Sequence, residues 1–292
     1  MRITTGMKDA DIQRNLSALS ARHADATRRA LSGRAVNKPS DDPAAAAELA
    51  RNRLTKAAQE AGQDSLDRAR GDLELAEGVL AEAGDLFQQA REIAMQGANG
   101  SLDASQRATL AKQVGQLKEQ LVSLANTQGS NGYLFAGSKT NATPFSSAGA
   151  FSGDDVDHVV DLGSGTPTAV GASGARAFTA AGGRDVFADL DALSAALNAN
   201  DSAATSATLS RLDSAREQLM TVQAESGLRL ARLDTTESVM ERMSQALAER
   251  DDAVAGADPY AAYTDMVSLQ QSLEQAVAVA RKVLDLGSLF RF

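Results

Sequence analysis

The chain has 292 residues, of which 43% are hydrophobic and 23% charged, a balance typical of folded protein in two or three subdomains. The lack of cysteine excludes disulfides, thiol catalysis and cysteine metal sites, and the two histidines, His23 and His158, offer little for a histidine-based centre. A formal net charge of −9 argues against nucleic acid as the main partner, because phosphate binding needs a basic surface.

Charge is uneven along the chain, since residues 1–40 hold eight Lys or Arg and only three Asp or Glu. Such an arm could be a transit peptide or a nucleic-acid tail. Asp9, Asp11 and Asp25 interrupt the basic residues, and the apolar residues have helical spacing, so a folded helix is favoured. The sequence lacks the pattern of a cleavable secretory signal and has no run of 18 apolar residues, so we expect no membrane insertion.

The first predicted helix carries a thin apolar seam that ends at Gly33, a suitable C-cap. The seam follows steps of four and three residues, the spacing that keeps one stripe facing a partner helix. Its assembly positions are Ile12, Leu16, Leu19 and His23. Pro39 and Pro43 then forbid a continuous helix. We expect a hinge here, with Asp42 as N-cap and Pro43 as the first residue of the next helix.

Two helices with apolar seams are predicted next. Large and small residues alternate from Leu66 to Ala90, which lets two helices approach closely, and a second seam runs from Leu110 to Leu124. Residues 97–100 form the predicted turn between them, and Ser101 or Asp103 caps the second helix.

Helical periodicity disappears between residues 137 and 183, which hold nine of the 23 glycines and two of the five prolines. Short β-prone pieces occur at residues 133–135, 158–162 and 177–179. We interpret the segment as a small β-rich insert, with a disordered linker as the alternative.

Helical spacing returns from Val186 to Leu197 and continues in a long helix whose heptad seam is polar in its middle, at Ser226 and Arg229. Asp258-Pro259 marks a second hinge and restarts the last helix. The assembly positions predicted for that helix are Tyr263, Met266, Leu273, Val277 and Leu284.

The predicted fold is therefore mainly α with a small β-rich insert, in which both chain ends form an antiparallel long-helix or coiled-coil bundle. We expect a terminal assembly domain of residues 1–42 and 257–292, a helical bundle of residues 43–136 and 184–256, and an outer domain of residues 137–183. Both terminal seams are thin and rich in alanine, whose burial adds little against the cost of ordering the chain. We expect the ends to be marginal in a single molecule and ordered in an assembly.

Patterns that suggest chemistry have simpler interpretations. Residues 132–140 resemble a phosphate loop, but the lysine stands one place late and no helix is predicted to follow. The pair Asp41-Asp42 suits a helix cap and the pair Asp154-Asp155 a solvated turn, rather than a metal site. His23 lies on the seam, and the sequence offers no second metal ligand to accompany it. We therefore predict no catalytic residue, no cofactor and no metal.

Four blocks, in order along the chain, resemble the bacterial flagellin superfamily, and within it the branch at the junction of hook and filament. They are the start, residues 1–7; the Leu-Ser-Gly-Arg to Pro-Ser-Asp-Asp-Pro block, residues 31–45; the entry to the insert, residues 131–145; and residues 258–266 of the last helix. The two prolines of the second block favour the junction branch over filament flagellin.

The resemblance implies a non-enzymatic structural adaptor of the bacterial flagellum, with a filament flagellin subunit as the alternative. It implies export through the flagellar type III apparatus, delivery by an export chaperone that holds the C-terminal helix, and an extracellular place in the flagellum. The implied neighbours are copies of itself in a ring, hook-associated protein 1 and flagellin.

Overall fold

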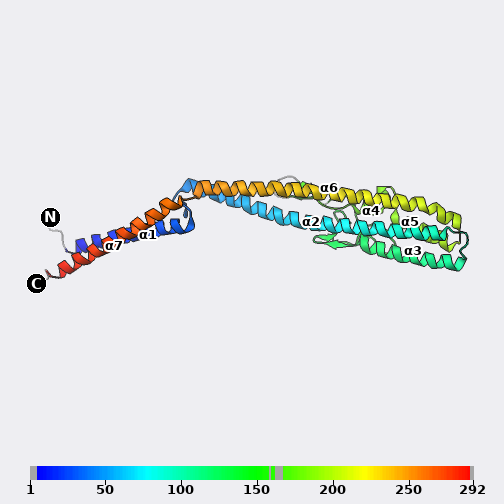
Figure 1. The fold of residues 1–292 in the computed structure, drawn as a ribbon, viewed down its shortest axis with the longest axis horizontal. Coiled ribbons are helices and arrows are strands. Elements are labelled where there is room, and N and C mark those ends of the chain that lie inside the picture. Colours follow the sequence, from blue (N-terminus) through cyan, green and yellow to red (C-terminus); the bar gives the residue numbers. More distant parts are fainter. Residues whose placement is uncertain (1–4, 158, 162–166, 290–292) are drawn as a thin grey trace. The chain divides into compact units, whose positions relative to one another are not determined.

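The computed structural model describes residues 5–157, 159–161 and 167–289, and it is mainly helical with two small β-hairpins (Figure 1). The helices are α1 Thr5–Ser32, α2 Pro43–Gly97, α3 Ala104–Ala125, α4 Gly174–Phe178, a 3-10 turn η1 Ala180–Gly182, α5 Val186–Asn198, α6 Ser202–Ala255 and α7 Pro259–Leu289. The strands are β1 Gln128–Gly129, β2 Gly132–Tyr133, β3 Val159–Asp161 and β4 Pro167–Ala169. The predicted fold class is confirmed.

The chain divides into two compact units. The terminal unit comprises residues 1–57 and 242–292, and the central unit comprises residues 58–241. The division falls within the long helices α2 and α6. The three domains predicted from the sequence concern roles in an assembly, and they stay a prediction.

In the terminal unit, α1 packs along α7 in antiparallel fashion (Figure 1). Gly33 ends α1 in the left-handed conformation, with φ of 65°, and its N–H donates to the carbonyl of Arg29 at 3.0 Å. Backbone bonds then join the connection to the end of α6. Ala35 N–H donates to Ala255 O at 2.6 Å, and Ala257 N–H donates to Gly33 O at 2.9 Å.

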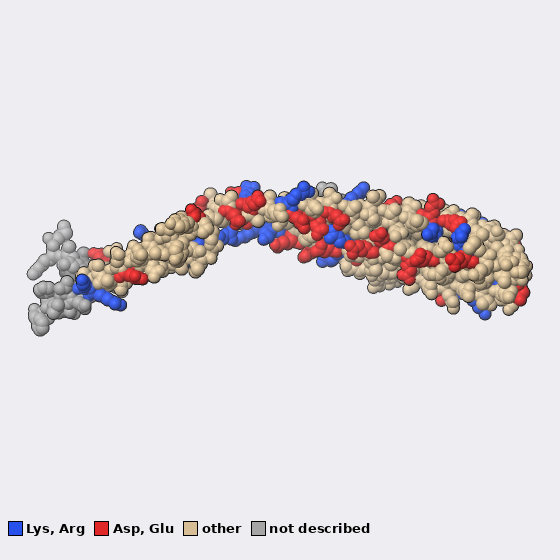
Figure 2. Space-filling view, in the orientation of Figure 1, with Lys and Arg blue, Asp and Glu red and all other residues tan. Residues whose placement is uncertain are grey.

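In the central unit, α2 and α6 run antiparallel, and acidic and basic side chains are interspersed over their surface (Figure 2). The Arg70 guanidinium lies 2.6 Å from a carboxylate oxygen of both Asp234 and Glu237. Arg91 lies 2.8 Å from Asp213, three heptads farther along the pair. These surface pairs fix the register of the two helices more than they stabilise them.

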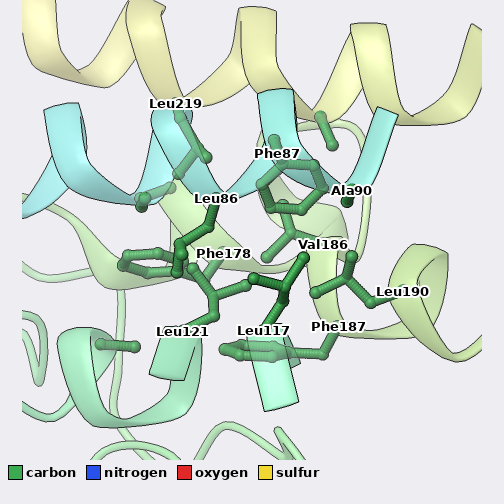
Figure 3. Packing of buried hydrophobic residues seen from close by; sticks show 14 of the residues in the cluster. Leu86, Phe87, Ala90, Leu117, Leu121, Phe178, Val186, Phe187, Leu190 and Leu219 are labelled. Carbon is green, nitrogen blue, oxygen red and sulfur yellow. The ribbon is translucent and has the colours of Figure 1, made fainter. Parts of the chain in front are cut away.

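The core of the central unit lies where α3 and α5 join the α2–α6 pair (Figure 3). Leu86, Phe87 and Ala90 come from α2, Leu117 and Leu121 from α3, Val186, Phe187 and Leu190 from α5, and Leu219 from α6. The large and small residues that alternate along α2 from Ala76 to Ala90 are buried here, as the spacing predicts.

The connection from α2 to α3 is held by a buried arginine. Arg107 Nε donates to Gly97 O at 2.9 Å and Nη2 to Asn99 O at 2.8 Å, so its charge lies at the carbonyl end of α2. Of the two predicted caps, Asp103 is the one used, and it forms a reciprocal capping box with Gln106.

The insert has no separate core among the described residues, because its aromatic rings enter the helical core. Phe135, Phe145 and Phe178 pack edge to face with centroid separations of 5.2 and 5.4 Å, and Phe145 also contacts Phe187 of α5. The β1–β2 hairpin pairs Gln128 with Tyr133, and the β3–β4 hairpin pairs Val159 with Ala169.

Residues 177–179, which the sequence analysis predicts as a strand, are not one. Ala177 and Phe178 lie in α4, where the Ser173 side chain caps the helix by accepting the N–H of Arg176. The aromatic residue suggests a strand, but Phe178 is buried in the common core and tertiary packing decides its conformation. Of the piece 133–135, Tyr133 lies in β2 whereas Leu134 and Phe135 lie in a turn. Residues 159–161 form β3, and His158 and Leu162 lie outside the described residues.

The polar middle of the α6 seam faces the insert. Arg229 donates to the carbonyl of Gly171 and, at 2.9 Å, to Asp157, while buried Ser226 donates to Val222 O within the helix. Farther along the same helix pair, Leu66, Leu73 and Leu233 form a second cluster with Val170 of the insert. The interruption of the heptad pattern thus marks where the insert crosses the helices.

Candidate assembly surface

The seam predicted on α1 lies on the face that meets α7. Ile12, Leu16, Leu19 and His23 are half-buried, and Ala26 is buried. The stripe is narrow, because the neighbouring positions between these residues are mostly exposed. A two-helix layer covers such a stripe on one side only.

The matching seam on α7 is similarly incomplete. Met266, Leu273 and Val277 are half-buried, whereas Tyr263 is 61% exposed. Leu284 lies in α7, and its side chain is outside the described residues. Ala280, on the predicted seam, is buried, and Ala262, Leu269 and Ala276, which the sequence analysis did not single out, are half-buried as well.

An open groove of about 590 Å³ runs along the α1–α7 pair. Ile12, Leu16 and Leu19 line one wall, and Ala276, Val279 and Val283 line the other. Val279 is 61% exposed. Apolar side chains that two helices leave uncovered are suited to contact with further helices.

The two predicted hinges are capped helix starts. Pro43 is the first residue of α2, and the Asp42 carboxylate accepts the N–H groups of Ala44 and Ala45 at 2.9 and 3.0 Å. Pro259 is the first residue of α7, and Asp258 accepts the N–H of Tyr260 at 2.9 Å. Pro39 lies in the turn that joins α1 to α2. Whether the chain bends there in an assembly stays a prediction.

Asp41 has a role that sequence reasoning missed. Its carboxylate accepts the backbone N–H groups of Asn37 and Lys38 at 3.0 and 2.9 Å, and these bonds hold the pKa of Asp41 below its ordinary value. The signal was the spacing itself, because an aspartate a few residues beyond an Asn-Lys-Pro turn can accept the N–H groups at its start.

Asp25 ties α1 to the same turn. The Lys38 ammonium lies 3.0 Å from its carboxylate and Arg28 lies 2.9 Å away, and these partners, Lys38 first, lower the pKa of Asp25. The basic residues of the N-terminal arm thus partly serve an ion-pair network of the fold.

The sequence patterns that resembled chemical sites have structural partners. In the phosphate-loop-like segment, Phe135 and Ala136 are buried, and Tyr133 N–H donates to Thr140 O at 2.9 Å, so the loop closes on itself. Asp154 accepts the N–H and hydroxyl of Ser138 at 2.7 and 2.6 Å, and these bonds lower its pKa. Over the described ranges, no group of three metal-ligating side chains occurs.

Among helices in the described part of the chain, none is both long and apolar enough to cross a membrane.

Comparison with known proteins identifies relatives along most of the chain. Residues 3–140 match the family model of the bacterial flagellin N-terminal helical region. The flagellar hook-associated protein 3 of Salmonella typhimurium is 30% identical over 82% of this chain and 83% of its own length. B-type flagellin of Pseudomonas aeruginosa is 31% identical, but over only 43% of this chain and 26% of its own length.

A solved structure has a similar fold. The flagellar junction protein FlgL of Legionella pneumophila aligns with a TM-score of 0.57 at 19% identity, and the alignment covers 71% of this chain and 99% of that one. At this identity the likeness concerns the fold alone.

Proposed function

Because this chain belongs to the flagellar hook-associated protein 3 family, we propose that it is a non-enzymatic adaptor that joins the hook, through hook-associated protein 1, to the flagellin filament. The family consists of structural flagellar proteins. In this proposal copies of the chain form a ring, and the α1–α7 pair is the surface through which they assemble.

One observation carries the proposal: the apolar stripes of α1 and α7 remain half-buried when the two helices pair, and a groove between them stays open. Completing the burial requires further helices, and in a ring the neighbouring copies supply them. The thin stripes also suit a chain that is exported unfolded and ordered on assembly, because little free energy holds the two helices together in a single molecule.

Export and placement follow from the same proposal. The chain would leave the cell through the flagellar type III apparatus, with a dedicated chaperone holding the C-terminal helix, and it would occupy the extracellular hook–filament junction. A chaperone that covers α7 would protect the exposed Val279 and its neighbours before assembly.

The experiment replaces one groove residue at a time in the full chain. Leu16→Asp and Ala276→Asp place a charge in the groove, and Ser17→Asp and Gln271→Asp place the same charge at exposed positions on the same helices. The groove variants should reduce incorporation into flagella by about tenfold or more, because an unpaired carboxylate would be buried between helices. The control variants should incorporate normally.

Circular dichroism should show that every variant keeps the helices of the central unit. Normal incorporation of both groove variants would show that this surface has no role in assembly. The alternative, a filament flagellin, has a separate signature: the pure chain at high concentration would then form long filaments, whereas a junction protein should not.

A further inference from the structure

Beyond Leu49, the inner face of the first part of α2 is polar. Leu49 and Asn52 are buried, and Asn52 Nδ2 donates to the Asp251 carboxylate of α6 at 2.7 Å. Gln59, one heptad farther and already in the central unit, is 8% exposed, and neither atom of its side-chain amide has a hydrogen-bond partner among the described residues. A seam of this kind contributes little to holding two helices together.

The outer face of the same helical segment is apolar. Ala47, Ala50, Leu54 and Ala57 follow one another at steps of three, four and three residues, and all are exposed. Leu54 is 74% exposed, and it lies about 200° around the helix from the inward-facing Asn52. The amphipathic pattern is therefore the reverse of that expected for an outer helix face, which points to a partner on the outside.

Positive charge flanks this outer face. Arg51 and Arg53 are exposed on either side of Leu54, and no ion pair among the described residues includes either of them. Figure 2 shows basic side chains gathered along the first part of α2. A partner surface should therefore be acidic and should offer small residues around which the Leu54 side chain can fit.

The last part of α6, also in the terminal unit, has such a surface. On α6, Ala246, Glu249 and Ala253 lie at steps of three and four residues, and all are exposed. Asp252 adds a second exposed carboxylate at one edge, and neither acid forms an ion pair with a described residue. Since Asp251 points inward to Asn52, Glu249 and Ala253, two residues either side of it, point outward.

We propose that the outer face of α2 around Leu54 docks on the outer face of α6 around Glu249 in a second copy of this chain. The inference deepens the proposed function by assigning a contact to the ring. Leu54 would fit as a knob between Ala246 and Ala253, and Arg53 with its basic neighbours would meet Glu249 and Asp252. Because the two faces differ, the contact is head-to-tail, the type that generates rings and helical assemblies rather than closed pairs.

Cysteine cross-linking of the full chain in intact flagella tests the contact, since the chain has no cysteine of its own. Leu54→Cys combined with Ala253→Cys, or with Ala246→Cys, should give a ladder of disulfide-linked dimers, trimers and larger products after mild oxidation. A disulfide forms only when the two Cα atoms come within about 7 Å. The matched control, Leu31→Cys with Ala253→Cys, uses an equally exposed leucine of the terminal unit and should give no ladder.

Charge reversal supplies an independent measurement. Arg53→Glu and Glu249→Arg should each lower incorporation about tenfold by placing like charges together, and the double variant should restore it. Each side chain is exposed, so the variants should fold normally.

The possible outcomes distinguish a failure of the proposed contact from a failure of the proposed function. If the chain incorporates but the paired cysteines give no ladder and single reversals have no effect, the contact is wrong and the adaptor role stands. A dimer from Leu54→Cys alone would replace the head-to-tail arrangement by a symmetric one and overturn the proposal. If the wild-type chain is absent from flagella, the proposed function fails and the contact falls with it.

Discussion

Asp41 and Asp42, the two neighbouring aspartates before α2, have different structural roles. Asp42 caps the helix, whereas Asp41 holds the preceding turn by accepting the N–H groups of Asn37 and Lys38. Each carboxylate satisfies backbone donors that would otherwise face solvent at the end of a helix or turn. Substitution of one should therefore not be equivalent to substitution of the other.

Asp41 makes the turn sensitive to acid. Its pKa in the folded chain is lowered, so the stabilisation is fully present above the ordinary aspartate pKa of about 3.9 and is lost as the pH falls through the lower folded value. Asp41→Asn should reduce the melting temperature of the α1–α7 helices at neutral pH. The difference from wild type should shrink below about pH 4, measured by helical circular dichroism. A difference that stays constant down to pH 2 would contradict this role.

At the scale of elements, the chain from α4 to α5 depends on one side chain of α6. Gln218 is buried, and its Nε2 donates to the carbonyls of Ala177, Thr179 and Arg184 at 3.0–3.2 Å. Its Oε1 accepts the Arg184 N–H at 2.8 Å. A single amide thus satisfies several backbone groups of a segment that has little regular structure of its own.

Replacing this amide should destabilise the central unit. Gln218→Ala leaves those carbonyls without their donor and should cost about 1–3 kcal/mol in the free energy of unfolding. Chemical denaturation of the full chain followed by circular dichroism measures the change. Gln89→Ala on the exposed face of α2 is the matched control and should change stability by less than about 0.5 kcal/mol. Equal effects of the two substitutions would exclude a structural role for Gln218.

At the scale of the whole molecule, both hydrophobic core clusters of the described residues lie in the central unit. Both hydrophobic clusters consist of residues between 58 and 241. Among the residues of α1 and α7 whose burial the structure describes, Ala26 and Ala280 are the only buried hydrophobic ones. Cooperative folding should therefore reside in the central unit.

Removal of either end should leave that unit folded. A chain without residues 1–40, or without residues 259–292, should keep its main cooperative unfolding transition within a few degrees of the full chain, because no residue of either cluster is removed. Calorimetry measures the transition, and incorporation into flagella should be lost in both cases. Unfolding of the truncated chains at room temperature would show that the ends are part of the cooperative core.

Sequence by itself determined the features that depend on local chemistry. The periodic seams gave the helices, Asp42-Pro43 and Asp258-Pro259 gave two helix starts, and Gly33 gave the end of α1. Each of these follows from residues within one or two helical turns, where propensity and capping dominate.

Only the tertiary structure decided the features that depend on residues distant in sequence. Ala177 and Phe178 are helical because the Ser173 cap and the aromatic core hold them so, and neither effect is visible in their local pattern. Arg229 interrupts the heptad pattern because the insert supplies Asp157 and Gly171 as its partners. Likewise, the outer face of Leu54 is recognisable only once Asn52 is known to point inward, because an alanine-rich helix has no single apolar side to read from sequence.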